Sequence, residues 1–153
     1  MNVALRDADE SDAGFLLELY RDTRIDEIAA WGWNAEQADA FLRMQHNARA
    51  LGYAAQHPEA TDSIILMDDE PVGRMLVDHL PNEIWLVDIA LQRKWRGRGV
   101  GSQLIRQLIE AGRDKGKPVR LHVSTINPAK RLYERLGFTT VGEDGGYFLM
   151  ELR

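Results

Sequence analysis

The stretch Trp95-Arg-Gly-Arg-Gly-Val-Gly-Ser-Gln-Leu-Ile105 places glycine at every second position between two arginines and an apolar segment. Val100, Leu104 and Leu108 recur at helical spacing, which predicts a glycine-rich turn leading into the start of a helix. Backbone amides at a helix N-terminus lack an intrahelical acceptor and carry partial positive charge. We therefore expect an anion such as a pyrophosphate here, with Arg96 and Arg98 adding charge. A merely solvated surface turn would need one glycine at the helix boundary rather than three.

The composition of the chain limits the kinds of protein and ligand that are compatible with this turn. The chain has 153 residues of which 44% are hydrophobic, which suits one domain over residues 1–153. A net charge of -5 without a long Lys/Arg run argues against nucleic acid or a membrane surface as partner. No cysteine is present and the four histidines are scattered, so we expect no disulfide, thiolate chemistry or metal site. No leader-like segment or long apolar run is found, and we expect a cytoplasmic protein with a small ligand.

Periodicity before the turn predicts two helices followed by a sheet. Residues 3–6 are a strand candidate, and apolar residues between 15 and 20 follow at helical spacing. Asn34 and Gln37 form a capping pair for a second helix, which His57-Pro58 ends. Residues 64–67, 72–77 and 84–91 are apolar or β-branched runs separated by turn signals, which predict an antiparallel meander.

Periodicity after the turn predicts a helix, a strand, a short helix and a hairpin. Residues 119–123 alternate as a strand, and the next helix has Asn127 as cap, Pro128 at its first position and Gly137 as its stop. Residues 138–141 and 147–152 flank a Gly145-Gly146 turn. The fold class is therefore predicted to be α+β.

Two familiar phosphate motifs do not fit the turn. The Lys and Ser/Thr of a P-loop are missing, and the glycine spacing departs from that of a dinucleotide-binding loop. The chain instead resembles the GNAT superfamily of acetyl-CoA-dependent N-acyltransferases, whose signature (Gln or Arg, two residues, Gly, one residue, Gly or Ala) is met by Arg96, Gly99 and Gly101. The preceding VDIALQRKW resembles the family's central strand and its exit. TINPAKRLYERLGF resembles its later Asn, Ala, Tyr and Gly-Phe segment.

This resemblance implies a mixed, mostly antiparallel central sheet flanked by helices, with a splayed strand pair that holds acyl-CoA. Acetyl-CoA would be the cosubstrate, with no metal. The main chain of the splayed strand would pair with the pantetheine arm at Ile89, Ala90 and Leu91. The pyrophosphate would lie on the backbone of the turn, formed by Gly97, Arg98, Gly99, Val100, Gly101 and Ser102. Asn127 would meet the pantetheine or acetyl region, and Lys130 could reach the outer phosphate.

The same resemblance names catalytic candidates. Tyr133 matches a family tyrosine that lies near the cofactor sulfur and protonates the departing thiolate. Glu83 and Asp88 occupy positions where family members carry acidic residues that deprotonate or orient the acceptor amine. Strand alternation puts these two carboxylates on opposite faces unless a bulge intervenes, so the choice between them stays open.

The acceptor is not identified by the sequence. Family members build the acceptor wall from the first helices, where Arg24, Glu27, Trp31 and Trp33 combine aromatic and charged groups that suit a pocket as well as a core. The expected function is transfer of an acetyl group to a primary amine of a small molecule or peptide by direct attack in a ternary complex. The alternative is a non-catalytic acyl-CoA-binding or sensing domain, and the resemblance leaves a homodimer open. A nucleotide hydrolase is disfavoured because residues 92–106 contain no carboxylate for magnesium.

Overall fold

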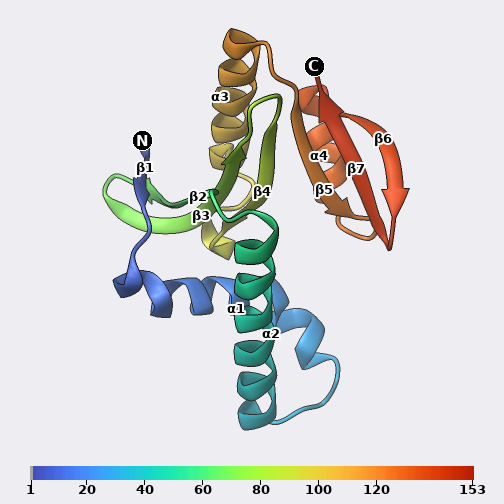
Figure 1. Cartoon of the computed structure of the whole chain (residues 1–153). Coiled ribbons are helices and arrows are strands. Elements are labelled where there is room, and N and C mark those ends of the chain that lie inside the picture. Colours follow the sequence, from blue (N-terminus) through green and yellow to red (C-terminus); the bar gives the residue numbers. More distant parts are fainter. Residues whose placement is uncertain (1) are drawn as a thin grey trace.

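The computed structural model describes residues 2–153 and contains helices on both sides of a central sheet (Figure 1). Its helices are the short 3-10 turns η1 (Glu10–Asp12) and η2 (Arg93–Trp95), and α1 (Ala13–Ala29), α2 (Ala35–Gln56), α3 (Val100–Lys115) and α4 (Ala129–Leu136). Its strands are β1 (Val3–Asp7), β2 (Thr61–Met67), β3 (Glu70–His79), β4 (Ile84–Leu91), β5 (Val119–Ser124), β6 (Thr139–Asp144) and β7 (Tyr147–Leu152).

The seven strands form one sheet in the order β1-β2-β3-β4-β5-β7-β6. Neighbouring strands are antiparallel except β4 and β5, which are parallel and are connected through α3. The strands β2, β3 and β4 form the predicted antiparallel meander. The predicted α+β class with a mixed, mostly antiparallel sheet is therefore confirmed.

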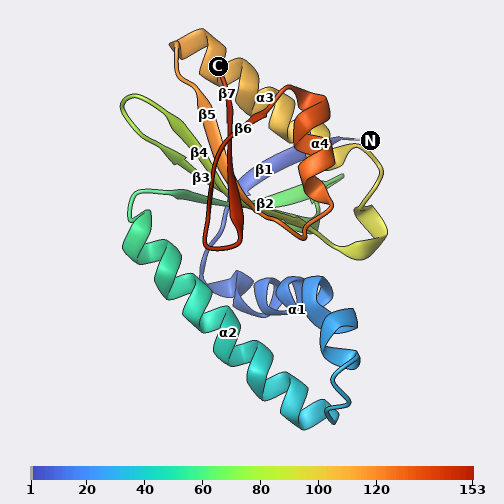
Figure 2. The ribbon, with the colours of Figure 1, turned by 90° about the vertical axis from the view of Figure 1, so that its right-hand side faces the viewer.

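The helices lie in two pairs on opposite sides of the sheet, as Figure 2 shows. The apolar face of α3 packs on the sheet through residues such as Leu104, Ile105 and Leu108, and Tyr133 of α4 joins the same core. On the other side, α1 and α2 bury a small separate cluster that includes Ile28 and Leu42. No helix among residues 2–153 is long and apolar enough to cross a membrane.

The helix boundaries follow the local signals expected from the sequence, except that α4 begins one residue later than predicted, with Pro128 as its N-cap. Asn34 and Gln37 make both hydrogen bonds of a capping box at the start of α2. The side chain of Asn127 accepts a hydrogen bond of 2.9 Å from the Ala129 amide, and α4 ends at Gly137 with a φ of 108°. That left-handed conformation favours glycine, so the stop signal has a direct steric cause.

The two central strands separate along their length. β4 and β5 pair only at Ile84–Val119, Trp85–Arg120 and Leu86–Leu121. Beyond these positions the rest of β4 has no ladder with β5, although it remains paired with β3 on its other edge. This is the predicted splay, and it leaves main-chain groups of β4 facing a gap between strands.

A bulge in β4 changes which side chains share a face. Val77 of β3 pairs with Leu86 and the next residue back, Leu76, pairs with Asp88, so Val87 is the extra residue. Leu86 packs into the core on the α3 side of the sheet, and so does Ile89 after the bulge. Trp85 and Asp88 therefore both point to the opposite face, which is the face next to α2.

Close approach of β3 to β4 requires glycine at position 73. A Cβ atom there would lie 2.3 Å from the carbonyl oxygen of Ala90 and 2.8 Å from the Leu91 side chain.

We expect Gly73→Ala to lower the free energy of unfolding by about 1–3 kcal/mol, the usual cost of overpacking. The matched control for this prediction is Gly52→Ala, in α2, where an added Cβ atom meets nothing within 4 Å. The Gly52→Ala change should stabilise the helix by up to ~1 kcal/mol. Urea unfolding of both variants measures the difference, and equal stabilities would contradict the steric argument.

Candidate active site

The glycine-rich turn leads into α3 with its backbone amides free. Gly97 and Gly99 have φ values of 71° and 85°, which favour glycine. Within residues 2–153, the amides from 97 to 102 donate to no protein acceptor, and the first amide bonded back to the turn is that of Gln103, 3.0 Å from the Gly99 oxygen. The turn thus presents unpaired N–H groups at the positive end of a 16-residue helix.

Gly101 is not required by the fold. It lies inside the first turn of α3, and a Cβ atom there would make ordinary contact, 3.8 Å from the Leu91 side chain. The backbone conformation at position 101 does not require glycine, and the missing side chain leaves the backbone accessible. That is what close approach of a bulky anion would require.

The two arginines of the turn are held by neighbouring groups. Arg96 donates from Nε to the carbonyl oxygen of Leu91 at 3.0 Å, which ties the turn to the end of β4. The Arg98 guanidinium lies 5.2 Å from the ring centroid of Trp95. Both side chains therefore place positive charge beside the free amides.

The splayed part of β4 carries Ile89, Ala90 and Leu91 immediately before the turn. These residues pair with β3 on one edge, in the register Met75–Ile89, Arg74–Ala90 and Gly73–Leu91. On the β5 side they have no ladder partner within residues 2–153. An extended ligand could add backbone-like hydrogen bonds along this edge.

Asp88 lies at the point where the strands diverge, between two arginines. Its Oδ1 is 3.8 Å from Arg49 of α2, its Oδ2 is 4.0 Å from Arg74 of β3, and its side chain is 21% exposed. Burial raises the pKa of Asp88, and the two nearby guanidinium groups only partly oppose this. The result is a carboxylate that takes up a proton more readily than an ordinary aspartate.

Tyr133 reaches the same region from α4. Its ring is 9% exposed and packs edge-on against Phe138 at 5.9 Å. Burial raises the pKa of Tyr133 to about 12, and the negative charge of Asp88 adds to the shift. The charge of the predicted aspartate therefore acts on the predicted tyrosine, which stays protonated more readily than an ordinary tyrosine.

Three further residues around Asp88 were not predicted from the sequence. Burial raises the pKa of Tyr53 to about 12, with Asp88 contributing, and Arg49 donates to the Tyr53 hydroxyl at 2.5 Å. Arg74 is fixed by two hydrogen bonds to Asp62, at 2.9 and 3.0 Å. The sequence contains a pattern that could have indicated the α2 residues. Polar or aromatic side chains recur there every three or four residues and so share one helix face, at His46, Arg49, Tyr53 and His57.

Glu83 lies on the same side of the sheet as Asp88, but its carboxylate binds other residues. Its carboxylate accepts from the Trp85 indole at 2.9 Å and lies 3.2 Å from Arg120. Arg120 in turn bridges to Glu151 of β7 at 2.8 Å. Glu83 thus belongs to a cross-strand ion network at the start of β4.

Asn127 and Lys130 lie at the start of α4. The side-chain oxygen Oδ1 of Asn127 accepts the hydrogen bond from the Ala129 amide described above. The Lys130 ammonium lies 4.5 Å from the centroid of the Phe148 ring and 3.8 Å from Glu134. The Lys130 ammonium therefore contacts a ring of β7 and a carboxylate of α4.

Of the expected acceptor residues, Arg24 and Glu27 lie in α1, and Trp31 and Trp33 lie in the connection from α1 to α2. Arg24 bonds to Glu27 at 2.9 Å and to the Tyr20 hydroxyl at 2.8 Å. Trp31 and Trp33 pack edge-on with Phe41 and are 43% and 42% exposed. Figures 1 and 2 place the α1–α2 connection at the end of the helix pair farthest from the sheet. The structure therefore does not bring these tryptophans together with Asp88 and Tyr133.

No group of three or more His, Asp or Glu residues that could hold a metal ion is found among residues 2–153. The groups that the splay presents are a carboxylate, tyrosine hydroxyls, guanidinium groups and free backbone amides.

Comparison with known proteins gives a family match over most of the chain. The model of the acetyltransferase (GNAT) family matches residues 11–138. The thialysine N-epsilon-acetyltransferase of Bos taurus is 29% identical over 160 residues, which covers 95% of this chain and 89% of the bovine protein. The cysteine-rich protein 2-binding protein of Mus musculus is 38% identical over 68 residues, which covers 44% of this chain but only 8% of the mouse protein.

Solved structures share the fold over the whole chain. The PaiA N-acetyltransferase of Thermoplasma acidophilum, in complex with coenzyme A, has a TM-score of 0.73 at 19% identity, covering 100% of this chain and 99% of its own. Naa50 of Arabidopsis thaliana, in complex with the bisubstrate analogue CoA-Ac-MVNAL, has a TM-score of 0.67 at 15% identity, covering 100% and 99%. At these identities the likeness concerns the fold.

Proposed function

Because the chain belongs to the acetyltransferase (GNAT) family and is an acyltransferase, we propose that it transfers an acetyl group from acetyl-CoA to a primary amine. The acceptor is a small molecule or a peptide end, and the amine attacks the thioester directly in a ternary complex. The name of the bovine relative, a thialysine N-epsilon-acetyltransferase, supports an amine as acceptor. The bound coenzyme A and the peptide analogue of the two structural relatives support the same pair of ligands.

In this proposal the cofactor lies across the splay and the glycine-rich turn. The free amides between Gly97 and Ser102 bind the pyrophosphate at the N-terminus of α3, and Arg96 and Arg98 add positive charge. The pantetheine arm pairs with the open edge of Ile89, Ala90 and Leu91. The thioester then lies where β4 and β5 diverge, between Asp88 and Tyr133.

The transfer needs a neutral amine and a leaving thiolate. Asp88 takes a proton from the acceptor ammonium, directly or through water, and the freed lone pair attacks the thioester carbonyl. The attacking nitrogen becomes positively charged as the new bond forms, and it releases its second proton to solvent. The bond from carbon to sulfur breaks, and the Tyr133 hydroxyl donates its hydrogen bond and then its proton to the departing sulfur. Solvent returns the tyrosine proton and removes the proton on Asp88. The products are an N-acetyl amide and free coenzyme A.

The observation that carries this proposal is the juxtaposition, at one splay, of an open strand edge, a helix N-terminus with free amides and the Asp88–Tyr133 pair. The direct test is release of free coenzyme A from acetyl-CoA across a panel of small amines, amino acids and peptides. Amine-dependent release with formation of the N-acetyl product is expected. A panel in which no amine accelerates release would remove the proposed activity.

Binding of the cofactor can be tested at Gly101. Gly101→Glu puts a carboxylate beside the proposed pyrophosphate site without a positive φ, whereas Gly99 would be strained by any side chain. Acetyl-CoA should raise the melting temperature of the wild-type protein by mass action. Gly101→Glu should weaken binding roughly ten-fold or more, because like charges at close range repel. Gly101→Ala is the matched control and should keep most of the shift. Equal shifts for wild type and Gly101→Glu would contradict the assignment of the turn.

A further inference from the structure

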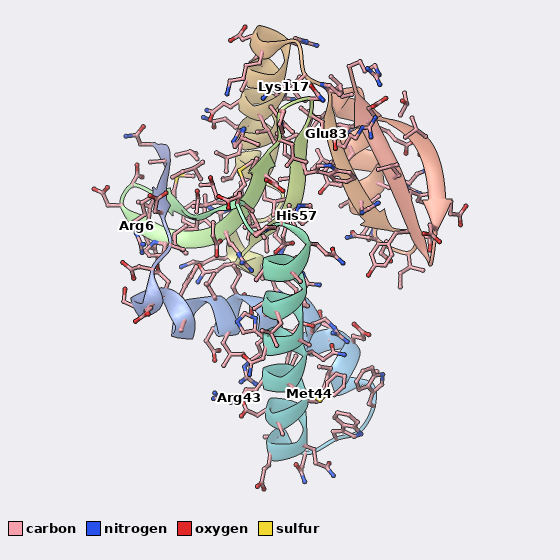
Figure 3. All side chains as sticks on the ribbon, viewed as in Figure 1. Arg6, Arg43, Met44, His57, Glu83 and Lys117 are labelled. Carbon is pink, nitrogen blue, oxygen red and sulfur yellow. The ribbon has the colours of Figure 1, made fainter. Side chains whose placement is uncertain are left out.

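A cavity lies near the start of β4, on the same face of the sheet as Asp88. Its volume is about 420 Å³, and it lies between the end of α2 and the strands β3, β4 and β5. Figure 3 shows His57 at the end of α2 that meets the sheet. The cavity is lined by Gln56, His57, Pro58, Glu59, Asp78, Leu80, Trp85 and His122.

The cavity contains a buried carboxylate with one free oxygen. The Asp78 side chain is 4% exposed, and its Oδ2 lies 2.8 Å from Nδ1 of His57. Its Oδ1 is buried and has no hydrogen-bond partner within residues 2–153. A buried acceptor without a partner is costly, so this oxygen is suited to a hydrogen-bond donor supplied by a ligand.

The other lining groups favour a cationic donor. The lining includes a second carboxylate, Glu59, and contains no Lys or Arg. The nearby cations are engaged, since Lys117 donates to the Leu80 carbonyl at 2.8 Å and Arg120 binds Glu83 and Glu151. The Trp85 and His122 rings, 5.1 Å apart, add an aromatic wall, and an indole face attracts ammonium and guanidinium groups.

The strand register gives the spacing of this cavity from the proposed reaction centre. Asp78 pairs with Trp85, and Leu76 pairs with Asp88. Two residues of β3 therefore separate the rows of Asp78 and Asp88, which is about 7 Å at the usual strand rise. Both carboxylates point to the α2 side of the sheet, so one short extended molecule could reach both.

From these observations we propose that the cavity binds a second cationic group of the acceptor, an ammonium or guanidinium that donates to Oδ1 of Asp78. The acceptor class is then a diamine or a basic amino acid or peptide end, whose primary amine reacts beside Asp88. The inference rests on the proposed acetyl transfer, because it places the far end of that reaction's acceptor. Asp78 is a specificity residue that makes no contact with the reacting atoms.

The test compares two acceptors that differ only at the far end. Cadaverine carries a terminal ammonium where n-hexylamine carries a methyl group, and its extended length is of the order of the ~7 Å spacing. Wild type should prefer cadaverine by roughly ten-fold or more in kcat/KM, the usual worth of a hydrogen bond to a charged group. Asp78→Asn should reduce this preference to near unity while leaving kcat/KM for n-hexylamine largely unchanged. Asp114→Asn, which removes an exposed carboxylate on α3, is the charge-matched control and should keep the preference.

A second variant and a binding measurement keep the outcomes separate. Glu59→Gln, at an exposed rim position, should reduce the preference in the same direction by a smaller factor, roughly two- to three-fold. Calorimetric titration of cadaverine into the protein with coenzyme A present requires no turnover, and Asp78→Asn should weaken that binding roughly ten-fold. Equal use of both amines by wild type would overturn the proposal and would leave the free oxygen to bound water. An unchanged preference for cadaverine in Asp78→Asn would overturn it as well. If Asp78→Asn does not fold, an unchanged preference in Glu59→Gln has the same meaning. If cadaverine binds through Asp78 but no amine is acetylated, the proposed function fails while the cation site stands.

Discussion

Replacing Tyr133 with phenylalanine is expected to lower kcat at saturating acetyl-CoA and amine by roughly 100-fold, the low end of the range for a positioned acid. The change removes one hydroxyl and leaves the aromatic ring, which packs edge-on against Phe138 in the core. Stability and cofactor binding should therefore change little. The loss should fall on the chemical step.

The pKa of Tyr133 clarifies which part of the chemistry is lost. Burial and the Asp88 charge raise it to about 12, so the hydroxyl stays protonated throughout the working range of pH. A tyrosine of that pKa is a weaker acid than a thiol with a pKa of about 8.5. Its main contribution is then a hydrogen bond to the negative charge that develops on sulfur, with the proton following as the bond to carbon breaks.

Single-turnover measurements with enzyme in excess over acetyl-CoA isolate this step from product release. The Tyr133→Phe variant should bind acetyl-CoA with a melting-temperature shift close to that of wild type. Its single-turnover rate should fall as much as kcat. An unchanged single-turnover rate in a folded variant would assign Tyr133 to packing alone and would leave water as the proton donor.

Local signals in the sequence were enough to predict most of the fold. The Asn34–Gln37 capping box and the Gly137 stop act within one helical turn, so each could be predicted without knowing the tertiary structure. The glycine-rich turn was predicted for the same reason, because Gly97 and Gly99 need positive φ whatever surrounds them. The splay of β4 was predicted through the family resemblance and not from strand patterns, and the parallel pairing of β4 with β5 was not among the predictions.

The relation between the carboxylates of Glu83, directly before β4, and Asp88, within β4, could not be predicted from the sequence. The run from Ile84 to Leu91 has a nearly uniform apolar pattern, and the bulge at Val87 arises from pairing with β3, which is a non-local interaction. The bulge puts Trp85 and Asp88 on one face and so changes the environment of both. Sequence alternation alone would have separated the two carboxylates.

The remaining parts of the candidate site depend on packing between distant segments. Arg49, Tyr53 and His57 read as an ordinary solvated helix face until α2 is placed against the sheet. Asp78 in β3 reads as a strand-end charge until the end of α2 covers it. The tryptophans at positions 31 and 33 suit either a pocket or a core by composition, and only the tertiary structure places them with Phe41 away from the splay.

Asp88 and Glu83 should respond differently to neutral substitution. Asp88→Asn is expected to lower kcat/KM for the amine by roughly 100-fold, because it removes the proposed proton acceptor at the splay. Glu83→Gln should lower it by no more than a few-fold, because that carboxylate is already bound to Trp85 and Arg120. The two substitutions remove the same charge at positions before and within β4, so each serves as the control for the other.

The pH dependence distinguishes a base from a residue that only binds the amine. With Asp88 present, kcat/KM should rise with pH through the elevated pKa of that carboxyl and again as the amine itself loses its proton. Asp88→Asn should lose the lower rise and keep the upper one. A residue that only binds the amine would, when replaced, raise KM and leave kcat unchanged. An Asp88→Asn enzyme with wild-type kinetics at every pH would exclude Asp88 from the reaction.

Stability should move in the opposite direction to activity. Because burial raises the pKa of Asp88, the folded protein binds this proton more tightly than the unfolded chain does. The resulting stabilisation is complete below the pKa of the unfolded chain, about 3.9, and is lost as the pH rises through the higher folded value. The asparagine side chain of the Asp88→Asn variant cannot ionise, so this variant should melt at a higher temperature than wild type near neutral pH, and the gap should close as the solution is acidified. Thermal melts of both proteins across that range test the sign. A variant that melts lower at neutral pH would mean that the pairs with Arg49 and Arg74 outweigh burial, and that Asp88 is held mainly as a structural ion pair.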